Sequence, residues 1–248
     1  MTTGTTIDPT EVNRFNTLSA RWWDERGPMA ALHAMNPVRL EYLRDKLCAQ
    51  FGRNPVESLP LAGLRLLDVG CGAGLLCEPL TRMGASVTGI DAAADNITVA
   101  AQHADAMGLS IDYREAVAED LTDEGWDAIL AMEVVEHVPN ADAFVSAVAG
   151  LVRPGGLFLG ATLNRTARSL ALAVGAAEYI FRWVPRGTHD WRRFITPAEF
   201  GAALRNAGLE VGDVTGILFK ASTGSWAQSR DVRINYILSA ERPAAAPA

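Results

Sequence analysis

Short apolar runs alternate with amphipathic stretches along the chain from residue 64 onward. The runs have the length of buried strands, and the stretches between them carry apolar residues at helical spacing. The predicted strands are Leu64–Val69, Ser86–Ile90, Ile111–Arg114, Trp126–Met132 and Leu157–Leu163, and the predicted helices are Leu75–Met83, Asp95–Met107 and Ala141–Leu151. This alternation predicts an α/β fold with a mostly parallel sheet that is covered by helices on both faces.

The residues before this alternation predict helices alone. Asp8-Pro9-Thr10-Glu11 offers an N-cap acid, a proline at the first helical position and a glutamate three residues after the cap. Phe15, Leu18 and Trp22 then recur at helical spacing, and Pro37–Phe51 predicts a second helix. The chain therefore begins with a helical cap in front of the sheet.

The residues after the fifth strand predict a further helix and two late strands. The helix opens at Thr196-Pro197-Ala198-Glu199 by the same capping pattern, and the strands are Leu209–Leu218 and Val232–Ser239. The predicted parts of the chain are a helical cap over 1–60, a main domain over 61–241 with an insertion at 165–195, and a flexible tail over 242–248.

The composition limits the location and the partners of the protein. With a formal net charge of −7 over 248 residues, nucleic acid is not an expected partner, because phosphate binding needs a basic face. Three cysteines without metal-type spacing argue against a disulfide framework or a zinc site. The polar N-terminus has no secretory signal, and no apolar stretch reaches the roughly 20 residues of a spanning helix. We therefore expect a cytoplasmic protein.

A glycine-rich loop joins the first strand to the first helix of the main domain. Gly70, Gly72 and Gly74 let the backbone turn sharply and approach a ligand, and a nucleotide or an amino-acid carboxylate could bind there. Packing is the alternative, since many such turns carry glycine for that reason alone. Asp91 ends the second strand, where a carboxylate can accept both hydroxyls of a ribose. A solvated or helix-capping aspartate is the alternative.

The loop reads G-x-G-x-G, whereas the dinucleotide-binding pattern is G-x-G-x-x-G. With Asp68 before the first glycine and Asp91 after the second strand, residues Leu64–Leu163 resemble the class I S-adenosylmethionine-dependent methyltransferases. The resemblance implies a Rossmann-like, seven-stranded sheet with an antiparallel last strand. It implies S-adenosylmethionine as cofactor, with Asp91 on its ribose and Glu119 on its adenine amine. Asp120 competes with Glu119 for that role, and a helix cap would explain either acid.

Stretches outside these cofactor motifs narrow the resemblance to the ubiquinone biosynthesis O-methyltransferases. The matching stretches are Ser19–Asp24, His33–Arg39, Met132–Val138, Thr162–Arg165, Ala177–Pro185, Gly187–Trp191 and Asp231–Tyr236. The resemblance implies methylation of polyprenylated catechol-type rings, namely 2-polyprenyl-6-hydroxyphenol and 3-demethylubiquinol, at two steps. Other ubiquinone-biosynthesis enzymes are implied as partners. A methyltransferase of another small hydroxylated aromatic molecule is the alternative.

The narrower resemblance assigns roles to two residues near the cofactor. It places Arg39 at the methionine carboxylate, a role that suits a guanidinium because it pairs bidentately with a carboxylate. Without the resemblance, Arg39 would be interpreted as a solvated helix arginine. The resemblance also makes Met132, at the end of the fourth strand, a cofactor-lining residue rather than a core methionine.

Glu133, Glu136 and His137 follow the fourth strand, at the sheet edge where an open α/β fold binds its ligands. Positions i, i+3 and i+4 share one face if the turn is helical, so the three side chains could converge on a divalent cation. The resemblance assigns Mg²⁺ to them. The alternative is that the glutamates cap the turn and His137 orients the substrate.

Methyl transfer to a phenol also requires loss of the hydroxyl proton, since a phenol with a pKa of about 10 is mostly neutral at pH 7. A bound cation would lower that pKa. Alternatively, His137 or His189 is the general base, because an imidazole titrates in the useful range. The predicted catalytic residues are His137, His189 and Glu136.

The segment Ser169–Val184 reads SLALAVGAAEYIFRWV and predicts an amphipathic helix within the insertion. It is too short and too charged to span a bilayer, but its aromatics, Tyr179, Phe181 and Trp183, suit the membrane interface. We expect it to make peripheral contact with the inner face of the cytoplasmic membrane. A helix packed over the active site or a dimer contact is the alternative.

Two functions of other classes are alternatives to a methyltransferase. A nicotinamide-dependent dehydrogenase is disfavoured because the glycine spacing departs from its pattern. A catalytically silent, membrane-docking scaffold is disfavoured because Arg39, Asp91 and the Glu133-Glu136-His137 cluster are all present.

Overall fold

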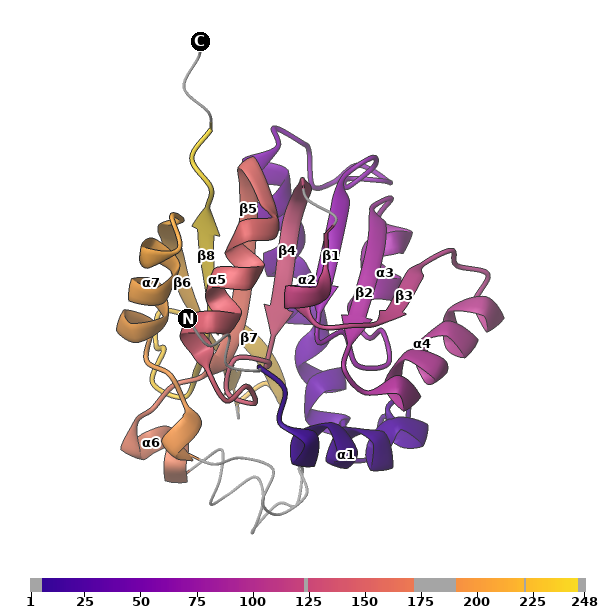
Figure 1. The fold of residues 1–248 in the computed structure, drawn as a ribbon, viewed down its shortest axis with the longest axis horizontal. Coiled ribbons are helices and arrows are strands. Elements are labelled where there is room, and N and C mark those ends of the chain that lie inside the picture. The colour runs from indigo at the N-terminus through magenta and orange to yellow at the C-terminus, as the bar shows by residue number, and fades with distance from the viewer. Residues whose placement is uncertain (1–5, 123–124, 172–190, 221, 245–248) are drawn as a thin grey trace.

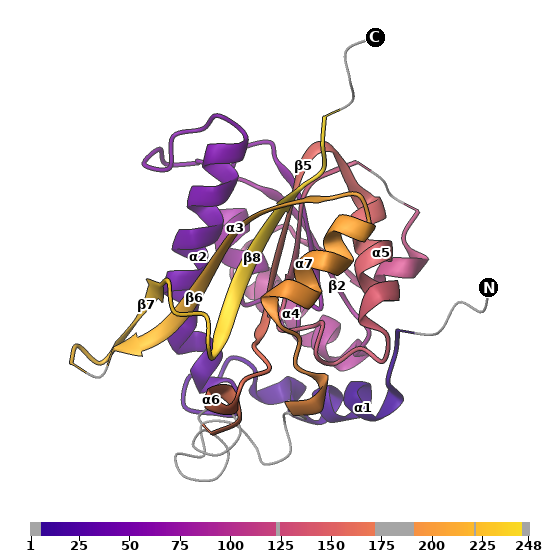
Figure 2. The ribbon, with the colours of Figure 1, turned by 90° about the vertical axis from the view of Figure 1, so that its left-hand side faces the viewer.

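The computed structural model describes residues 6–122, 125–171, 191–220 and 222–244. Within this part, eight strands form one sheet that lies between two layers of helices (Figures 1 and 2). The strands are β1 (Arg65–Val69), β2 (Ser86–Asp91), β3 (Asp112–Glu115), β4 (Trp126–Met132), β5 (Val152–Leu163), β6 (Glu210–Lys220), β7 (Ser225–Ser229) and β8 (Asn235–Glu241). The helices are α1 (Pro9–Leu18), α2 (Ala30–Gln50), α3 (Cys77–Arg82), α4 (Ala94–Ala106), α5 (Ala141–Leu151), α6 (Ala167–Ser169) and α7 (Pro197–Asn206), with 3₁₀ turns η1 (Ser19–Arg21), η2 (Ala118–Asp120) and η4 (Trp191–Arg193).

The order of the strands across the sheet is β3-β2-β1-β4-β5-β8-β6-β7. Strands β1 to β5 are parallel, and β8 runs antiparallel between β5 and β6. The direction of winding reverses between β1 and β4, so the carboxyl ends of these strands and of β2 meet at a switch point where such folds bind ligands. The predicted α/β fold with an antiparallel last strand is confirmed.

The core follows from the alternation of side chains along the central strands. Leu66 and Leu130 face one layer of helices, which includes α2 and α3, whereas Leu67 and Ile129 face the other, which includes α5 and α7. Figure 2 shows these two layers on opposite sides of the sheet. Neighbouring residues therefore both become buried, which explains why β1 and β4 read as continuous apolar runs.

Helix α1 lies across the carboxyl ends of the strands (Figure 1). Its N-terminus forms as the sequence predicts, because the Asp8 carboxylate accepts the Thr10 N–H at 3.0 Å and Pro9 opens the helix. Glu11, however, does not return to the cap; its carboxylate contacts His137, far along the chain. A complete capping box forms instead at α7, where Thr196 and Glu199 bond reciprocally.

Three elements differ from the prediction. Helix α2 begins at Ala30, so Pro37 lies inside it rather than at its start. Strand β5 begins at Val152 and not at the predicted Leu157, and it contains a bulge, since Val152 already pairs with Trp126 and the register shifts afterwards. Strand β7 is an eighth strand, beyond the predicted seven, and it pairs antiparallel with the edge strand β6. None of the helices in the described ranges is long and apolar enough to cross a membrane.

Candidate functional site

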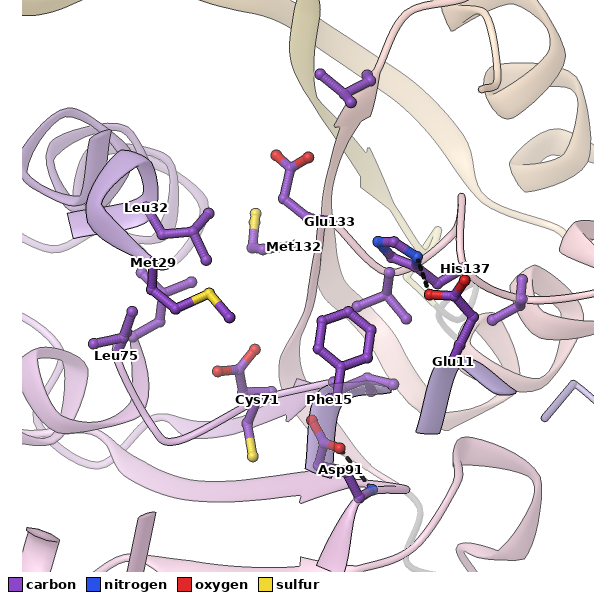
Figure 3. Close-up of a pocket in the computed structure, with 18 of the residues that line it drawn as sticks. Glu11, Phe15, Met29, Leu32, Cys71, Leu75, Asp91, Met132, Glu133 and His137 are labelled. Carbon is purple, nitrogen blue, oxygen red and sulfur yellow. Dashed lines mark hydrogen bonds and ion pairs between the residues drawn. The ribbon is translucent and has the colours of Figure 1, made fainter. Parts of the chain in front are cut away.

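A cavity of about 760 Å³ opens at the switch point, where α1 and α2 meet the carboxyl ends of β1, β2 and β4. Its lining includes most of the predicted site residues: Arg39, Asp68, Gly70, Asp91, Glu119, Met132, Glu133 and His137. Figure 3 shows Asp91 at one end of the cavity, with Met132, Glu133 and His137 toward the other. The volume is that of a pocket for a drug-sized ligand.

The three loop glycines all have positive φ angles, of 70°, 55° and 87°, but they serve different neighbours. Gly70 lines the cavity and donates its N–H to the Ile90 carbonyl at 2.8 Å. Gly72 packs under the Trp22 ring and Gly74 under the Tyr113 hydroxyl, where a Cβ atom would collide. Among the described residues, Gly72 and Gly74 therefore make room for the side chains of Trp22 and Tyr113. Their contact with a cofactor stays a prediction.

Asp91 is held rigidly by the backbone around it. One carboxylate oxygen accepts the Gly72 N–H at 2.9 Å, and the other accepts the Ala93 N–H at 2.8 Å. Burial raises the pKa of this carboxyl. Each oxygen has a second lone pair, so the two backbone bonds leave the capacity to accept two hydroxyl groups from the cavity.

Asp68 and Glu119 both line the cavity. Asp68 is buried and accepts the Cys77 thiol at 3.2 Å, and desolvation raises the pKa of its carboxyl to about 7. Glu119 lies in η2 and accepts a hydrogen bond from the Thr6 hydroxyl. This contact ties the start of the described chain to the cavity wall.

Arg39 and Glu133 form an ion pair across the cavity, with Nη2 and Oε1 2.5 Å apart. Arg39 is only 3% exposed, and its Nε has no partner among the described residues. Glu133 has a φ of 59°, and it is the one non-glycine position in the described part with a positive φ. Strained backbone of this kind clusters at functional sites and costs about 1–3 kcal/mol.

Glu136 points away from the cavity into the protein. It is 3% exposed, its Oε2 accepts the Thr162 hydroxyl at 2.9 Å, and its Oε1 has no partner within the described ranges. Desolvation, with the nearby charge of Glu133, raises the pKa of Glu136 well above its ordinary value. The carboxyl group thus favours its protonated form.

The predicted convergence of Glu133, Glu136 and His137 is not found. The turn after β4 is not helical, and although the Glu133 and Glu136 side chains are in contact, His137 is turned toward Glu11. Glu133 pairs with Arg39, and Glu136 is directed at Thr162. Across the residues that the structure describes, no group of three His, Cys, Asp or Glu side chains could hold a metal ion.

His137 forms a hydrogen bond with Glu11 of α1, and the sequence analysis missed this partner. Nδ1 and Glu11 Oε2 lie 3.0 Å apart, and the Phe15 ring packs edge-on against the imidazole at 5.3 Å (Figure 3). The hydrogen bond to His137 lowers the pKa of Glu11. Glu11 was interpreted as a helix-capping residue, and nothing in the local pattern distinguishes the two roles. His189 lies outside the described residues.

Two other histidines pack within the protein. His103 stacks on Trp23 with ring centroids 3.5 Å apart and bonds Glu78 at 2.5 Å. His33 bonds the Trp22 carbonyl at 2.7 Å. These contacts give both rings a packing role.

Comparison with known proteins supplies the family. A family model described as "Methyltransferase domain" matches residues 38–214. A protein of Methylobacterium nodulans named ubiquinone biosynthesis O-methyltransferase is 54% identical over 246 residues, which cover 98% of this chain and 99% of the relative. This chain belongs to the ubiquinone biosynthesis O-methyltransferase family. A relative of the same name from Rhizobium etli is 51% identical over 241 residues, covering 96% and 97% of the two chains.

Solved structures with similar folds have much lower sequence identity to this chain than these relatives have. Magnesium protoporphyrin IX methyltransferase from Synechocystis, solved with bound S-adenosylhomocysteine, has a TM-score of 0.67 at 20% identity, covering 94% of this chain and 98% of that one. A methyltransferase from Aquifex aeolicus has a TM-score of 0.60 at 15% identity, with 95% and 99% covered. At this identity the likeness concerns the fold alone, and it agrees with the class I methyltransferase fold predicted from the sequence.

Proposed function

We propose that this chain transfers a methyl group from S-adenosylmethionine to a ring hydroxyl of polyprenylated catechols and quinols in ubiquinone biosynthesis. The observation that carries the proposal is the composition of one cavity. Asp91 and Arg39 suit the polar ends of the donor, and His137 faces the same space. Family membership gives the pathway and the O-methyltransferase chemistry.

The residues of the cavity fit the cofactor. Asp91 has two acceptor positions for ribose hydroxyls, Gly70 brings the backbone close, and Arg39 has a buried Nε that lacks a partner within the described chain. A guanidinium that already meets Glu133 through one nitrogen can still take a carboxylate through Nε. When bound, S-adenosylmethionine supplies an electrophilic methyl group on a positively charged sulfur.

His137 is the proposed general base. Glu11 accepts the proton on Nδ1, which leaves Nε2 as the basic atom of the ring. Figure 3 shows the second ring nitrogen on the side of Glu133 and the cavity. Nε2 takes the hydroxyl proton while the walls hold the ring oxygen in line with the methyl group, and this positioning supplies much of the rate. His189 remains the alternative base.

Glu11 is expected to position His137, and Glu11→Gln tests this. The substitution should lower kcat about tenfold, because an amide no longer fixes the tautomer or stabilises the imidazolium. Glu25→Gln, at an exposed position near the same helices, is the matched control. A comparable loss in Glu25→Gln, or a lowered melting temperature of Glu11→Gln, would indicate a structural role only.

The proposed activity is tested by turnover of a short-tailed demethylubiquinol analogue with S-adenosylmethionine. We expect one S-adenosylhomocysteine for each methylated quinol. A small hydroxylated aromatic molecule without a tail is the comparison, since a methyltransferase of that class would prefer it. Absence of methylated product from every phenol would overturn the enzymatic proposal.

Magnesium is the part of the prediction that these residues do not fit as they are arranged. Glu133 is paired with Arg39, and the buried Glu136 accepts the Thr162 hydroxyl, so the two carboxylates do not present free oxygens to one cation. No step above is therefore routed through a metal ion. If the family resemblance is right about Mg²⁺, EDTA should abolish turnover, added Mg²⁺ should restore it, and the three side chains must rearrange. Undiminished turnover in EDTA would refute the magnesium prediction.

Peripheral contact with the inner face of the cytoplasmic membrane is proposed for Ser169–Val184. Most of this segment lies outside the described residues, so the proposal rests on its aromatic residues and on the arginines in and around it, Arg165, Arg168, Arg182 and Arg186. Replacing Tyr179, Phe181 and Trp183 by serine should reduce co-sedimentation with anionic liposomes several-fold, while calorimetry shows unchanged affinity for S-adenosylhomocysteine. Undiminished sedimentation would exclude this segment as the anchor. Association with other ubiquinone-biosynthesis enzymes is proposed on the resemblance alone.

A further inference from the structure

Beyond the residues proposed to bind the cofactor and to act as the base, the cavity has an apolar part, here called the apolar arm. Six of the residues that line this arm lie in β5, β6 and β7 or directly before β8: Leu163, Ile217, Leu218, Phe219, Trp226 and Ile234. Four of them belong to the β6–β7 hairpin, which includes the extra edge strand. Leu32 and Met35 of α2 line the cavity as well, and Trp226 packs against the buried cluster that contains Met35.

The hairpin presents one apolar face toward α2. Phe219 and Trp226 are directly paired across the two strands, with ring centroids 5.6 Å apart. Ile217, two residues before Phe219, shares that face because side chains alternate along a strand. Figure 2 shows β7 beside α2, and in the strand order β7 is separated from β2, which ends at Asp91, by five other strands. The second half of the cavity thus has a continuous apolar wall.

Charge is distributed unequally between the two halves of the cavity. None of the acidic residues in the described lining belongs to the β6–β7 hairpin; they are Asp8, Glu11, Asp68, Asp91, Glu119 and Glu133. The charged residue that lines the apolar arm is Arg168, whose guanidinium is 3.4 Å from the Asp231 carboxylate. Asn235 also lines this part of the cavity, but its Oδ1 already accepts the Ile217 N–H at 3.0 Å. A strongly polar ligand would therefore lose hydration in this arm, whereas a hydrocarbon chain would gain from burial.

The arm also has an opening. Phe219 is 45% exposed, and of the large exposed apolar side chains in the described ranges it is the one that also lines the cavity. A chain longer than the arm can therefore leave past Phe219 without bending back. This feature distinguishes a channel for a long tail from a closed pocket for a small apolar group.

We infer that the β6–β7 hairpin and α2 form the binding channel for the isoprenoid tail of the substrate, with Ile217, Phe219 and Trp226 as its apolar wall. The inference rests on the proposed function, since a polyprenylated ring is its ligand. With the ring hydroxyl at His137, the tail runs along the hairpin and leaves the protein at Phe219. The extra edge strand thereby sets the preference for tailed substrates.

The test compares two substrates, a catechol with a geranyl tail and the same catechol without a tail. Phe219→Asp should raise KM for the tailed catechol about tenfold, because a charge replaces an apolar contact, while KM for the tail-free catechol changes less than twofold. Phe219→Leu should stay within twofold of wild type on both. Met107→Asp is the matched control, since Met107 is 49% exposed and does not belong to the described lining.

The outcomes separate the channel from the proposed activity. A selective effect of Phe219→Asp on the tailed catechol supports the channel. An equal effect on both catechols, or none on either, overturns the channel while turnover of the tail-free catechol leaves the enzymatic proposal standing. A wild-type protein that methylates neither catechol overturns both. Calorimetry with S-adenosylhomocysteine checks that each variant retains its cofactor site.

Discussion

Replacing His137 by alanine is expected to lower kcat for methyl transfer by about 10²–10⁴, which is the usual contribution of a positioned general base. The expectation rests on the geometry of the ring, which lines the cavity with Nδ1 held by Glu11 and one face packed on Phe15. The measurement is the single-turnover rate with a short-tailed quinol at saturating S-adenosylmethionine. Affinity for S-adenosylhomocysteine should not change.

The pH dependence of the variant distinguishes loss of a base from loss of structure. Without His137, the rate should rise about tenfold for each pH unit toward the phenol pKa of about 10, because only the ionised hydroxyl reacts. A variant that is merely misfolded would show no such rise. Wild-type kcat in His137→Ala at neutral pH would move the role of base to another residue, with His189 as the first candidate.

Asp91→Ala is expected to weaken binding of S-adenosylhomocysteine by about 10²–10⁴-fold, because two hydrogen bonds to a charged group contribute about 1.5–3 kcal/mol each. Loss of the carboxylate also releases the Gly72 and Ala93 N–H groups that shape the loop. Asp91→Asn retains one acceptor oxygen and should lose less. Isothermal titration calorimetry measures both variants.

The control for Asp91 is the melting temperature of the apo variant, which separates local loss of the ribose contact from general destabilisation. NAD should not bind the wild-type protein. Unchanged affinity for S-adenosylhomocysteine in a folded Asp91→Ala variant would remove Asp91 from the cofactor site.

Elements with strong apolar patterns were predicted well from the sequence. Strand β4 and helix α5 have the predicted limits because both are buried and their patterns leave no other interpretation. Strand β7 reads SWAQS, which has no apolar run, and it forms because the edge of β6 is available for pairing. The start of α2 was placed at Pro37, but packing of Met35 in the core extends the helix past that proline.

The site was predictable where topology alone places a residue. Asp91 and Met132 end parallel strands, so the sheet brings them to the same edge. The pair of Glu11 and His137 was not predictable, because 126 positions separate the two residues and only the docking of α1 joins them. The orientation of Glu136 depends on the positive φ of Glu133, which breaks the helical spacing that the sequence suggested.

The crystal structure of the complex with S-adenosylhomocysteine, soaked with Mn²⁺, tests the central claim most directly. We predict the ribose hydroxyls at hydrogen-bond distance from the Asp91 carboxylate, the amino-acid carboxylate at Arg39, and the sulfur facing the space between Met132 and His137. The anomalous signal of Mn²⁺ would locate any cation near Glu133. Density for the ligand outside this cavity, or a ribose that does not meet Asp91, would contradict the account.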